Sequence, residues 1–376
     1  MQNQIRMCLM MLVMCMAWIS GPAWVGSVAT GQSASQTASV PELLQRYTQA
    51  LNVTQNFTDT YEEVVDYSYR MPGQSKAITG KSFARGQNRT DRVRLYCQKY
   101  IWGDFNQQNM DLPESTPRYN LRVEADKKLY SHATAVNNPR VKGTAYFQPA
   151  QQDQALLNME TYSGSYGYLG CDKRFDDVLR EAKQILVRPA TETVNGIACY
   201  VIDADTQYGQ YTVWLDPAHG YNATKVTRNA TAGHKEGEWL MSKGDQASGF
   251  VVITRFEQVA GVWVPAEAEQ EMVYTGGQLF RRDRSHYKRA NIVLNPDHDK
   301  LGSFDNPLVH PANDPELKNG TRVRITLPNS VRVKATWQDG KIADESGNVI
   351  DVTQLWDTTK LSLLNTPLPD LTEPGR

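Results

Sequence analysis

Cysteine is scarce in this chain of 376 residues, which holds five, and no two of them form a C-x-x-C pair. The spacing argues against a structural zinc site or a thioredoxin-like redox centre. Neither H-E-x-x-H nor G-x-S-x-G occurs, so the signatures of zinc metalloproteases and of nucleophile-elbow hydrolases are absent. The chain also lacks an excess of charge of one sign: it has 40 Lys and Arg and 41 Asp and Glu residues, and neither sign is concentrated in a long run. The basic footprint of a nucleic-acid binder is therefore missing.

Long apolar runs are also absent, and the longest covers Met7–Ile19 near the start of the chain. It is too short to cross a bilayer, which needs about 20 residues. Arg6 precedes this run, Gly21-Pro22 breaks it, and Ser27-Val28-Ala29 follows, which is the layout of a secretory signal peptide. The sequence thus predicts a signal peptide over 1–29 and an exported protein, periplasmic or extracellular.

Removal of that segment leaves three widely spaced cysteines, Cys97, Cys171 and Cys199. At most one pair can form among them, so a disulfide framework is excluded and the pairing stays open. Buried thiols are the simplest expectation for all three.

The remaining chain divides by composition. A Ser/Thr/Gln-rich leader covers 30–40, a strand-rich region covers 41–294, a Pro/Asp/Asn-rich linker covers 295–316, a small β unit covers 317–356, and a Leu/Pro/Thr-rich tail covers 357–376.

Two helices are predicted within the strand-rich region. The first begins at Pro41, with apolar residues at Leu43, Leu44, Tyr47 and Leu51 on one face. The second runs from an N-cap at Asp172 through Phe175–Leu186 and ends before Pro189.

Turn signals separate the predicted strands. Asn195-Gly196 and Ala125-Asp126-Lys127 predict hairpins, and Gly86-Gln87-Asn88 predicts a break between strands over 78–85 and 89–102. Pro265 predicts an edge position or a strand start. The order favours a mainly β protein with helices (α+β): a strongly curved antiparallel sheet, or half-open barrel, covered by two helices, plus the small C-terminal β unit.

Four local stretches carry a resemblance to a known family. They are the hairpin Glu192–Val201, the strand and turn Tyr211–Pro217, the pair Gly220-Tyr221, and Gly261–Pro265. With the order of helices and strands over about 41–293, this region resembles the lipoprotein-carrier superfamily, the periplasmic carrier and its outer-membrane receptor. The resemblance implies a curved sheet that binds acyl chains in an apolar cavity against its helices. The family's carriers are shorter, and the unit over 317–356 has no counterpart among them.

Metal and acid–base sites are only weakly signalled. Asn295, Asp297 and Asp299 alternate as in a calcium loop, but Lys300 stands where the loop needs glycine, so a solvated acidic turn is the better interpretation. Asp176 and Asp177 are adjacent on a helix and point about 100° apart, so they do not form a proton-sharing dyad. We expect them instead to interact favourably with the dipole at the N-terminus of that helix. We expect no cofactor and no metal.

Aromatic residues in apolar strands are the candidate ligand-binding site. They are Trp102, Trp214, Trp263, Tyr100, Tyr200 and Tyr211. On a curved sheet such residues line a cavity or pack an ordinary core, and both interpretations remain open.

These observations support a non-enzymatic, exported carrier-like protein whose ligand is a lipid, an acylated protein or another apolar molecule. The alternative is a structural or protein-interaction module of the cell envelope, in which the unit over 317–356 docks a partner protein. An enzyme whose site is assembled from distant residues is the third possibility. Nucleic acid is not expected as a partner, and the oligomeric state is not indicated.

Overall fold

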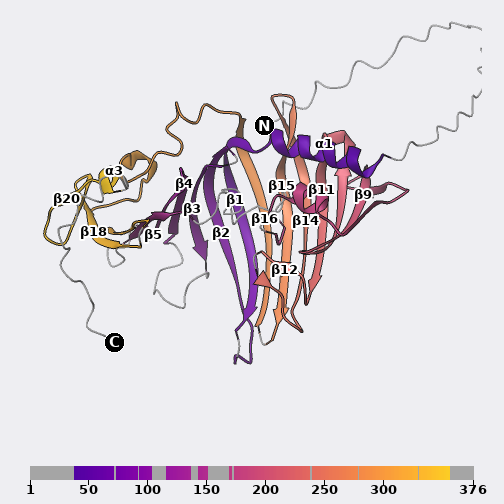
Figure 1. Cartoon of the computed structure of the whole chain (residues 1–376), viewed down its shortest axis with the longest axis horizontal. Helices are drawn as coiled ribbons and strands as arrows, with labels where there is room; N and C mark the ends of the chain where they lie inside the picture. The colour runs from indigo at the N-terminus through magenta and orange to yellow at the C-terminus, as the bar shows by residue number, and fades with distance from the viewer. Residues whose placement is uncertain are drawn as a thin grey trace, which may run out of the picture. The chain divides into compact units, whose positions relative to one another are not determined.

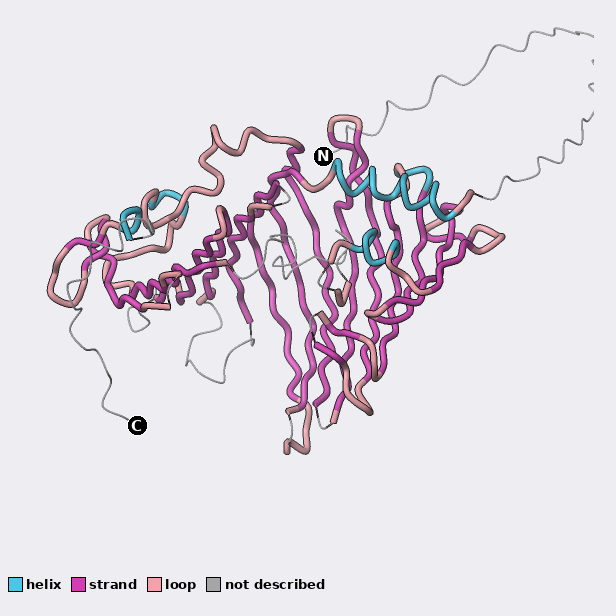
Figure 2. The backbone as a smooth tube through the Cα atoms, in the orientation of Figure 1, coloured by secondary structure: helices cyan, strands magenta, loops and turns pink. Residues whose placement is uncertain are grey.

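A computed structural model describes residues 38–355 except 72, 92, 104–115, 137–142, 151–168, 172, 238, 278 and 329. Figures 1 and 2 show that strands dominate these residues. The predicted signal peptide, most of the predicted leader and the tail lie outside the described residues. Within the described part, no helix is long and apolar enough to cross a membrane.

The strands form two antiparallel series that join in one sheet. The first series is β1 (Asn56–Arg70), β2 (Ile78–Asp91), β3 (Leu95–Gly103), β4 (Arg118–Ala125), β5 (Lys128–Ala135) and β6 (Thr144–Pro149). The second is β9 (Ile197–Thr206), β10 (Gly209–Asp216), β11 (Asn222–Thr231), β14 (Gln246–Val259), β15 (Val262–Gly276) and β16 (Leu279–Leu294). Antiparallel pairing of β1 with β16, from Phe57↔Leu294 to Arg70↔Phe280, joins the two series.

Shorter strands continue the sheet at both ends. At one end, β7 (Gln184–Val187) and β8 (Glu192–Val194) share the outer edge of β9. At the other, β17 (Arg322–Thr326) pairs in parallel with β6, followed by β18 (Arg332–Gln338), β19 (Lys341–Ala343) and β20 (Val349–Ile350). The strands β12 (Lys235–Glu236) and β13 (Trp239–Leu240) form a separate hairpin.

Three α-helices and two 3₁₀ turns complete the described residues. They are α1 (Val40–Val53), α2 (Phe175–Arg180), α3 (Val352–Leu355), η3 (Pro217–His219) and η4 (Pro311–Asn313). The sheet is curved and not closed, and α1 runs across its strands (Figure 1). The predicted fold class, a curved half-open sheet with helices on one side, is confirmed.

One face of the sheet packs against α1 and α2, and we call it the helix face. Leu43, Tyr47 and Leu51 of α1 and Phe175 and Leu179 of α2 share one core with the sheet residues of this face. Those sheet residues include Phe57, Tyr61, Val213, Val226, Val251, Ala268 and Tyr287. Burying each such side chain contributes about 1.5–3 kcal/mol, so this core is the main stabilising element of the sheet.

The opposite face of the long central strands carries charge, and we call it the ladder face. Ion pairs connect neighbouring strands there, at Arg85–Glu62, Lys288–Glu267, Arg255–Glu267, Arg284–Glu269 and Arg282–Glu271. Most of these side chains are about half exposed, so each pair contributes only about 0–1 kcal/mol. These charged pairs keep the ladder face hydrated, so the apolar surface of the sheet that needs burial lies on the helix face.

A second core covers the other face of β3–β6. Leu95 and Cys97 of β3 belong to the first core, whereas Tyr96 belongs to the second, since successive side chains of a strand alternate. Phe304 and Leu308, in the region predicted as a linker, pack into this second core together with residues of β17–β19. The division at 295–316 and 317–356 stays a prediction.

The second predicted helix is too long. Only Phe175–Arg180 is helical, and Gln184–Val187 forms β7, where Ile185 pairs with Ala204. Ile185 and Leu186 fit the helical period by chance. Pairing of this segment with β9 outweighs its helical propensity. The predicted cap, Asp172, lies outside the described residues.

The predicted break at Gly86 is also wrong, because β2 continues through it to Asp91. The strand ends later: the Asp91 carboxylate accepts hydrogen bonds from the backbone N–H groups of Val93 and Arg94, forming a turn where alternation predicted a strand. Gly86 instead faces Tyr61, its partner on β1, whose ring covers the glycine.

The hairpins signalled by sequence are confirmed. Asn195 and Gly196 have φ of 51° and 82°, and Asp126 and Lys127 have φ of 52° and 60°, as a type I′ turn requires. Pro265 lies near the start of β15, which pairs with β16 only from Glu267 onward.

Gly86→Ala tests the close approach of strands. A Cβ there would lie 2.2 Å from the backbone oxygen of Gln98, so we expect a loss of about 1–3 kcal/mol in unfolding free energy. Gly80→Ala is the matched control, because its Cβ would meet only the far end of the Tyr67 side chain, which can rotate away. Urea unfolding measures both, and equal losses would contradict this explanation.

Candidate functional site

The helix face has a hollow of about 500 Å³ beside the part covered by the helices, and we call it the trough. Its sides come from the long strands β1, β2, β15 and β16, with β3, β12 and β14 at its margins. The lining residues are Glu63, Val65, Ser82, Ala84, Lys99, Ile101, Glu236, Ala247, Gln270, Met272, Val273, Tyr274, Leu279, Arg281, Asp283 and Ser285.

The period of the strands places these residues on the helix face. On β1, Glu63 and Val65 continue the side of Tyr61, and on β15, Gln270 and Met272 continue that of Ala268. The trough is therefore the extension of the apolar core beyond the helices, along the same strands.

The trough joins apolar side chains with charges that are largely paired. Val65, Ala84, Ile101 and Met272 supply apolar surface. Arg281 Nε lies 2.5 Å from Asp283 Oδ2 across the lining.

A buried arginine holds Glu236, a residue of the trough lining, in place. The guanidinium of Arg228 donates to the Tyr208 carbonyl (2.8 Å), the Lys235 carbonyl (2.8 Å) and Glu236 Oε2 (2.6 Å). Its side chain is wholly buried, so these bonds fix the β12 hairpin to β11. Gly170 packs directly on the guanidinium, where a Cβ would lie 1.9 Å from Nη1.

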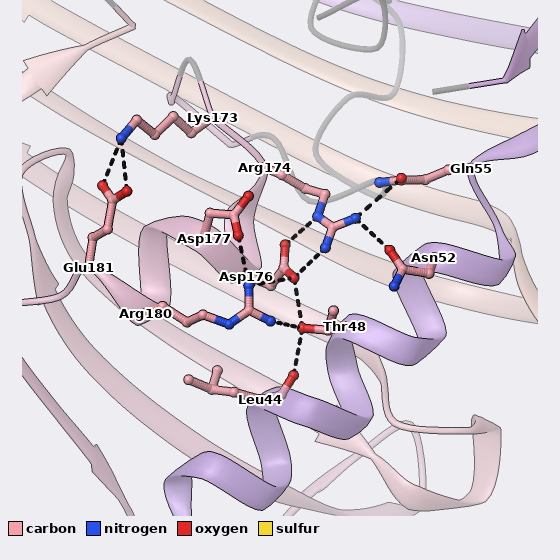
Figure 3. A network of polar contacts seen from close by, with 10 residues as sticks. All are labelled: Leu44, Thr48, Asn52, Gln55, Lys173, Arg174, Asp176, Asp177, Arg180 and Glu181. Carbon is pink, nitrogen blue, oxygen red and sulfur yellow. Dashed lines mark hydrogen bonds and ion pairs between the residues drawn. The ribbon is translucent and has the colours of Figure 1, made fainter. Parts of the chain in front are cut away.

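Figure 3 shows a polar network that holds α2 to α1. Asp176 is fully buried; its Oδ2 accepts a hydrogen bond from Thr48 Oγ1 (2.7 Å), and Arg174 binds it through two nitrogens. Arg180 reaches both Asp176 (3.1 Å) and Thr48. Burial alone would raise the pKa of Asp176, but the hydrogen bonds from Arg174 and Thr48 and the charge of Arg180 outweigh it and hold the pKa below its ordinary value.

A groove of about 550 Å³ lies next to this network. Its walls come from α1, α2 and β7, and Leu44, Thr48, Leu179 and Ile185 line it. The network thus sets the spacing of the two helices along the groove. Sequence reasoning missed this role, because it gave Asp176 only a helix-dipole role.

The six aromatic residues predicted as a ligand site lie on several parts of the sheet. Tyr211 is buried in the first core, where its ring contacts Phe175 and its hydroxyl donates to the Leu169 carbonyl. Tyr200 stacks on Tyr221, at the margin of the same core.

The tryptophans lie elsewhere. Trp214 packs with Cys199 and Val201, and its indole N–H donates to Glu192. Trp263 contacts His219 edge-on at 4.7 Å.

On β3, Trp102 contacts the rings of Phe83 and Tyr100, and Tyr100 also contacts Tyr119 of the second core. None of the six lines the trough or the groove. Their role in ligand binding stays a prediction.

The sequence of one strand carries a signal for the trough. The strand β16 reads L-F-R-R-D-R-S-H-Y-K-R, and its alternate residues Arg281, Asp283 and Ser285 line the trough. Only the pairing of β1 with β16 brings them beside Val65, and no local pattern specifies that pairing.

Among the described residues, two Asp–His pairs lie within hydrogen-bond distance, while a third, exposed pair, His310 and Asp305, is 3.9 Å apart. Asp216 Oδ2 lies 2.6 Å from His219 Nδ1, whose ring stacks on Phe256. Asp314 Oδ2 lies 2.8 Å from His132 Nδ1 and accepts from Tyr130 at 2.6 Å, all fully or nearly fully buried.

Neither of the two closer pairs lines the trough, and the second anchors the 295–316 region to β5. The described residues contain no group of three or more His, Cys, Asp or Glu side chains arranged to hold a metal ion. In the acidic turn, Asp299 pairs with Arg94 and Asp297 accepts from the backbone of Lys300. The cysteines Cys97, Cys171 and Cys199 are buried thiols.

Solved structures similar to this chain include lipoprotein-sorting folds. A DUF1329 family protein from Desulfovibrio piger is 14% identical, with a TM-score of 0.30, over 70% of this chain and 96% of that one. A putative outer membrane lipoprotein-sorting protein domain from Vibrio parahaemolyticus is 12% identical, with a TM-score of 0.30, over 69% and 96%. A LolA superfamily protein from Nitrosomonas europaea is 13% identical, with a TM-score of 0.30, over 72% and 98%.

No family model matches the chain, and no curated protein matches it. The similarity to the structures described as outer membrane lipoprotein-sorting and LolA superfamily proteins is remote. At this degree of similarity it assigns neither a ligand nor a partner.

Asp176→Asn tests the helix network. Because the pKa of Asp176 is depressed in the folded protein, its contribution is complete above the ordinary value of 3.8 and is lost as pH falls through the lower folded value. We expect Asp176→Asn to lower the unfolding free energy at pH 7 by about 3 kcal/mol and to weaken its dependence on pH below about 4.

Asp177→Asn is the control, because the side chain of Asp177 is half exposed and bonds only Arg180 among the described residues. We expect it to change stability by less than about 1 kcal/mol. Chemical denaturation across the pH range measures both variants, and equal effects would show that the buried network does not hold the helices.

Proposed function

We propose that this protein is an exported, non-enzymatic carrier that holds an apolar ligand, a lipid or a lipoprotein acyl chain, in the trough. The observation that carries the proposal is the position of the trough. It continues the face of the sheet that is buried under the helices, so a ligand there covers the apolar surface that the helices leave uncovered.

Size and lining support an elongated apolar ligand. A volume of about 500 Å³ falls within the usual range of small-molecule sites, about 300–1,000 Å³. Val65, Ile101 and Met272 offer contacts along neighbouring strands, and each methylene buried there contributes about 0.8 kcal/mol.

The charges around the trough favour a ligand whose buried part is neutral. Asp283 pairs with Arg281 and Glu236 with Arg228, so these charges already have protein partners. A charged group entering between them would have to displace such a pair and lose its own hydration.

One further point supports a carrier over an enzyme. The two Asp–His pairs lie outside the trough lining, so neither faces the proposed ligand. Export to the periplasm or beyond rests on the pattern of residues 1–29.

Val65→Phe tests ligand binding in the trough. Val65 is partly exposed, so a larger side chain fills the hollow without displacing buried atoms. We expect it to lower the affinity for the apolar dye N-phenylnaphthylamine by about tenfold, or about 1.4 kcal/mol. Fluorescence titration measures the affinity, and mass spectrometry of extracts of the purified protein identifies bound lipid.

Val64→Phe is the matched control, since the neighbouring valine lies on the other face of the same strand, opposite Phe83 and His286. It should leave dye affinity unchanged. A wild-type protein that binds no dye and carries no lipid, or a Val65→Phe variant that binds as the wild type does, would overturn the proposal.

The alternative is an interaction module of the cell envelope that docks a partner protein through β17–β20. Val349 on β20 is 63% exposed, which offers apolar surface at that edge. Removing 317–376 is not a clean test, because Val323, Ile325 and Trp337 complete the second core. Val349→Asp is the better variant: loss of a captured partner, with dye binding intact, favours the alternative.

A further inference from the structure

Two large apolar side chains stand exposed on the β12–β13 hairpin. Trp239 is 81% exposed and Leu240 is 69% exposed. Leaving both in water forgoes about 1.5–3 kcal/mol for each side chain. Within the described residues, no packing contact buries either side chain.

The hairpin that carries them is firmly anchored. Glu236 and Lys235 are bound by the buried guanidinium of Arg228. On the other side, Met241 is buried against Ala230 and Ala247, and its N–H donates to the His234 carbonyl. Trp239 and Leu240 therefore project from a fixed support.

The hairpin is inserted between β11 and β14, at the end of these two strands where Thr231 lies opposite Gln246. Strand β14 begins beside the end of β15, with Gln246 opposite Thr275, and β1 ends beside the start of β16, with Arg70 opposite Phe280. The β1–β2 turn extends from the long strands at this end, at the bottom of Figure 1. Met71 in that turn is a third exposed apolar residue, 48% exposed.

Unpaired cations occur in the same two turns as these apolar residues: Arg70 and Lys76 flank Met71, and Lys243 follows β13. Arg70, Lys76 and Lys243 are exposed at this end and form no ion pair within the described residues. The carboxylates nearby are engaged: Asp66 pairs with Lys81, Asp283 with Arg281, and Glu271 with Arg282, while Asp245 accepts from the backbone of Ser242. The sequence of the hairpin adds Glu238.

We propose that this end of the sheet, with Trp239, Leu240 and Met71, docks on the surface of an anionic phospholipid bilayer. Tryptophan favours the boundary between headgroups and acyl chains, where its ring is buried and its N–H stays hydrated. Each cation near an anionic surface adds about 1 kcal/mol. Apolar side chains with unpaired cations in the same turns match such a surface better than they match a neutral protein face.

The proposal does not depend on the ligand of the trough. It does place Leu279 and Arg281 of the trough lining at the docked end of the strands. A membrane-bound protein would thus present that end of the trough to the bilayer.

The test is flotation of the full chain with vesicles of phosphatidylcholine, with or without phosphatidylglycerol. We expect binding to vesicles with phosphatidylglycerol, weaker binding without it, and weaker binding as salt rises from about 0.05 M to about 0.5 M. Trp239→Ser combined with Leu240→Ser should reduce the partition coefficient by about tenfold.

Leu186→Ser is the matched control, because Leu186 is 53% exposed on β7, at an edge of the sheet, and should leave binding unchanged. All variants share the apolar run Met7–Ile19, so differences among them report the hairpin. Equal binding by the double variant and the wild type, or no binding by the wild type, overturns the proposal. The proposal is also overturned if the double variant loses a dimer that the wild type forms but keeps its vesicle binding. The hairpin would then contact a second copy of the chain and not a bilayer.

Discussion

The alternation of side chains along five long strands is the constraint on which this structure depends. Strands β1, β2, β14, β15 and β16 are 14 to 16 residues long. Along β1, β15 and β16, ladder-face charges such as Glu62, Glu267 and Lys288 alternate with core residues such as Tyr61, Ala268 and Tyr287 on the helix face. A shift of one residue in any pairing would move charges such as Glu267 and Lys288 into the core. Register is therefore strongly specified across the whole width of the sheet.

The two faces contribute differently to the protein. The cross-strand ion pairs stabilise little but keep the ladder face hydrated and discourage pairing with other sheets. The helix face supplies the stabilising burial, and α1 and α2 cover only part of it. The trough is the part of that face beyond the helices, which is why fold and proposed function share one physical origin.

Local sequence signals specified the hairpins and the first helix, because turn chemistry and amphipathic period act over few residues. The predicted second helix failed at Ile185, where pairing with β9 overrode a helical period. Gly86 failed as a break because Tyr61 covers it from the neighbouring strand, a contact that turn statistics do not contain.

The candidate site was largely beyond sequence reasoning for the same reason. Aromatic density drew attention to Trp102, Trp214 and Trp263, which lie in different contacts of the sheet. The residues of the trough come from strands more than 200 positions apart, joined by the pairing of β1 with β16. The buried role of Asp176 likewise depends on Thr48, far away in the chain.

Thiol labelling of single cysteine variants along β1, from Glu62 to Asp66, measures the central claim most directly. The account predicts that labelling rates follow the alternation of the strand, fast at 62 and 66 and slow at 63. Adding an apolar ligand should slow labelling further at 65 but leave the rate at 64 unchanged. Rates that vary smoothly along the strand, or a ligand that protects 64 and 65 alike, would contradict a sheet with one hydrated and one ligand-covered face.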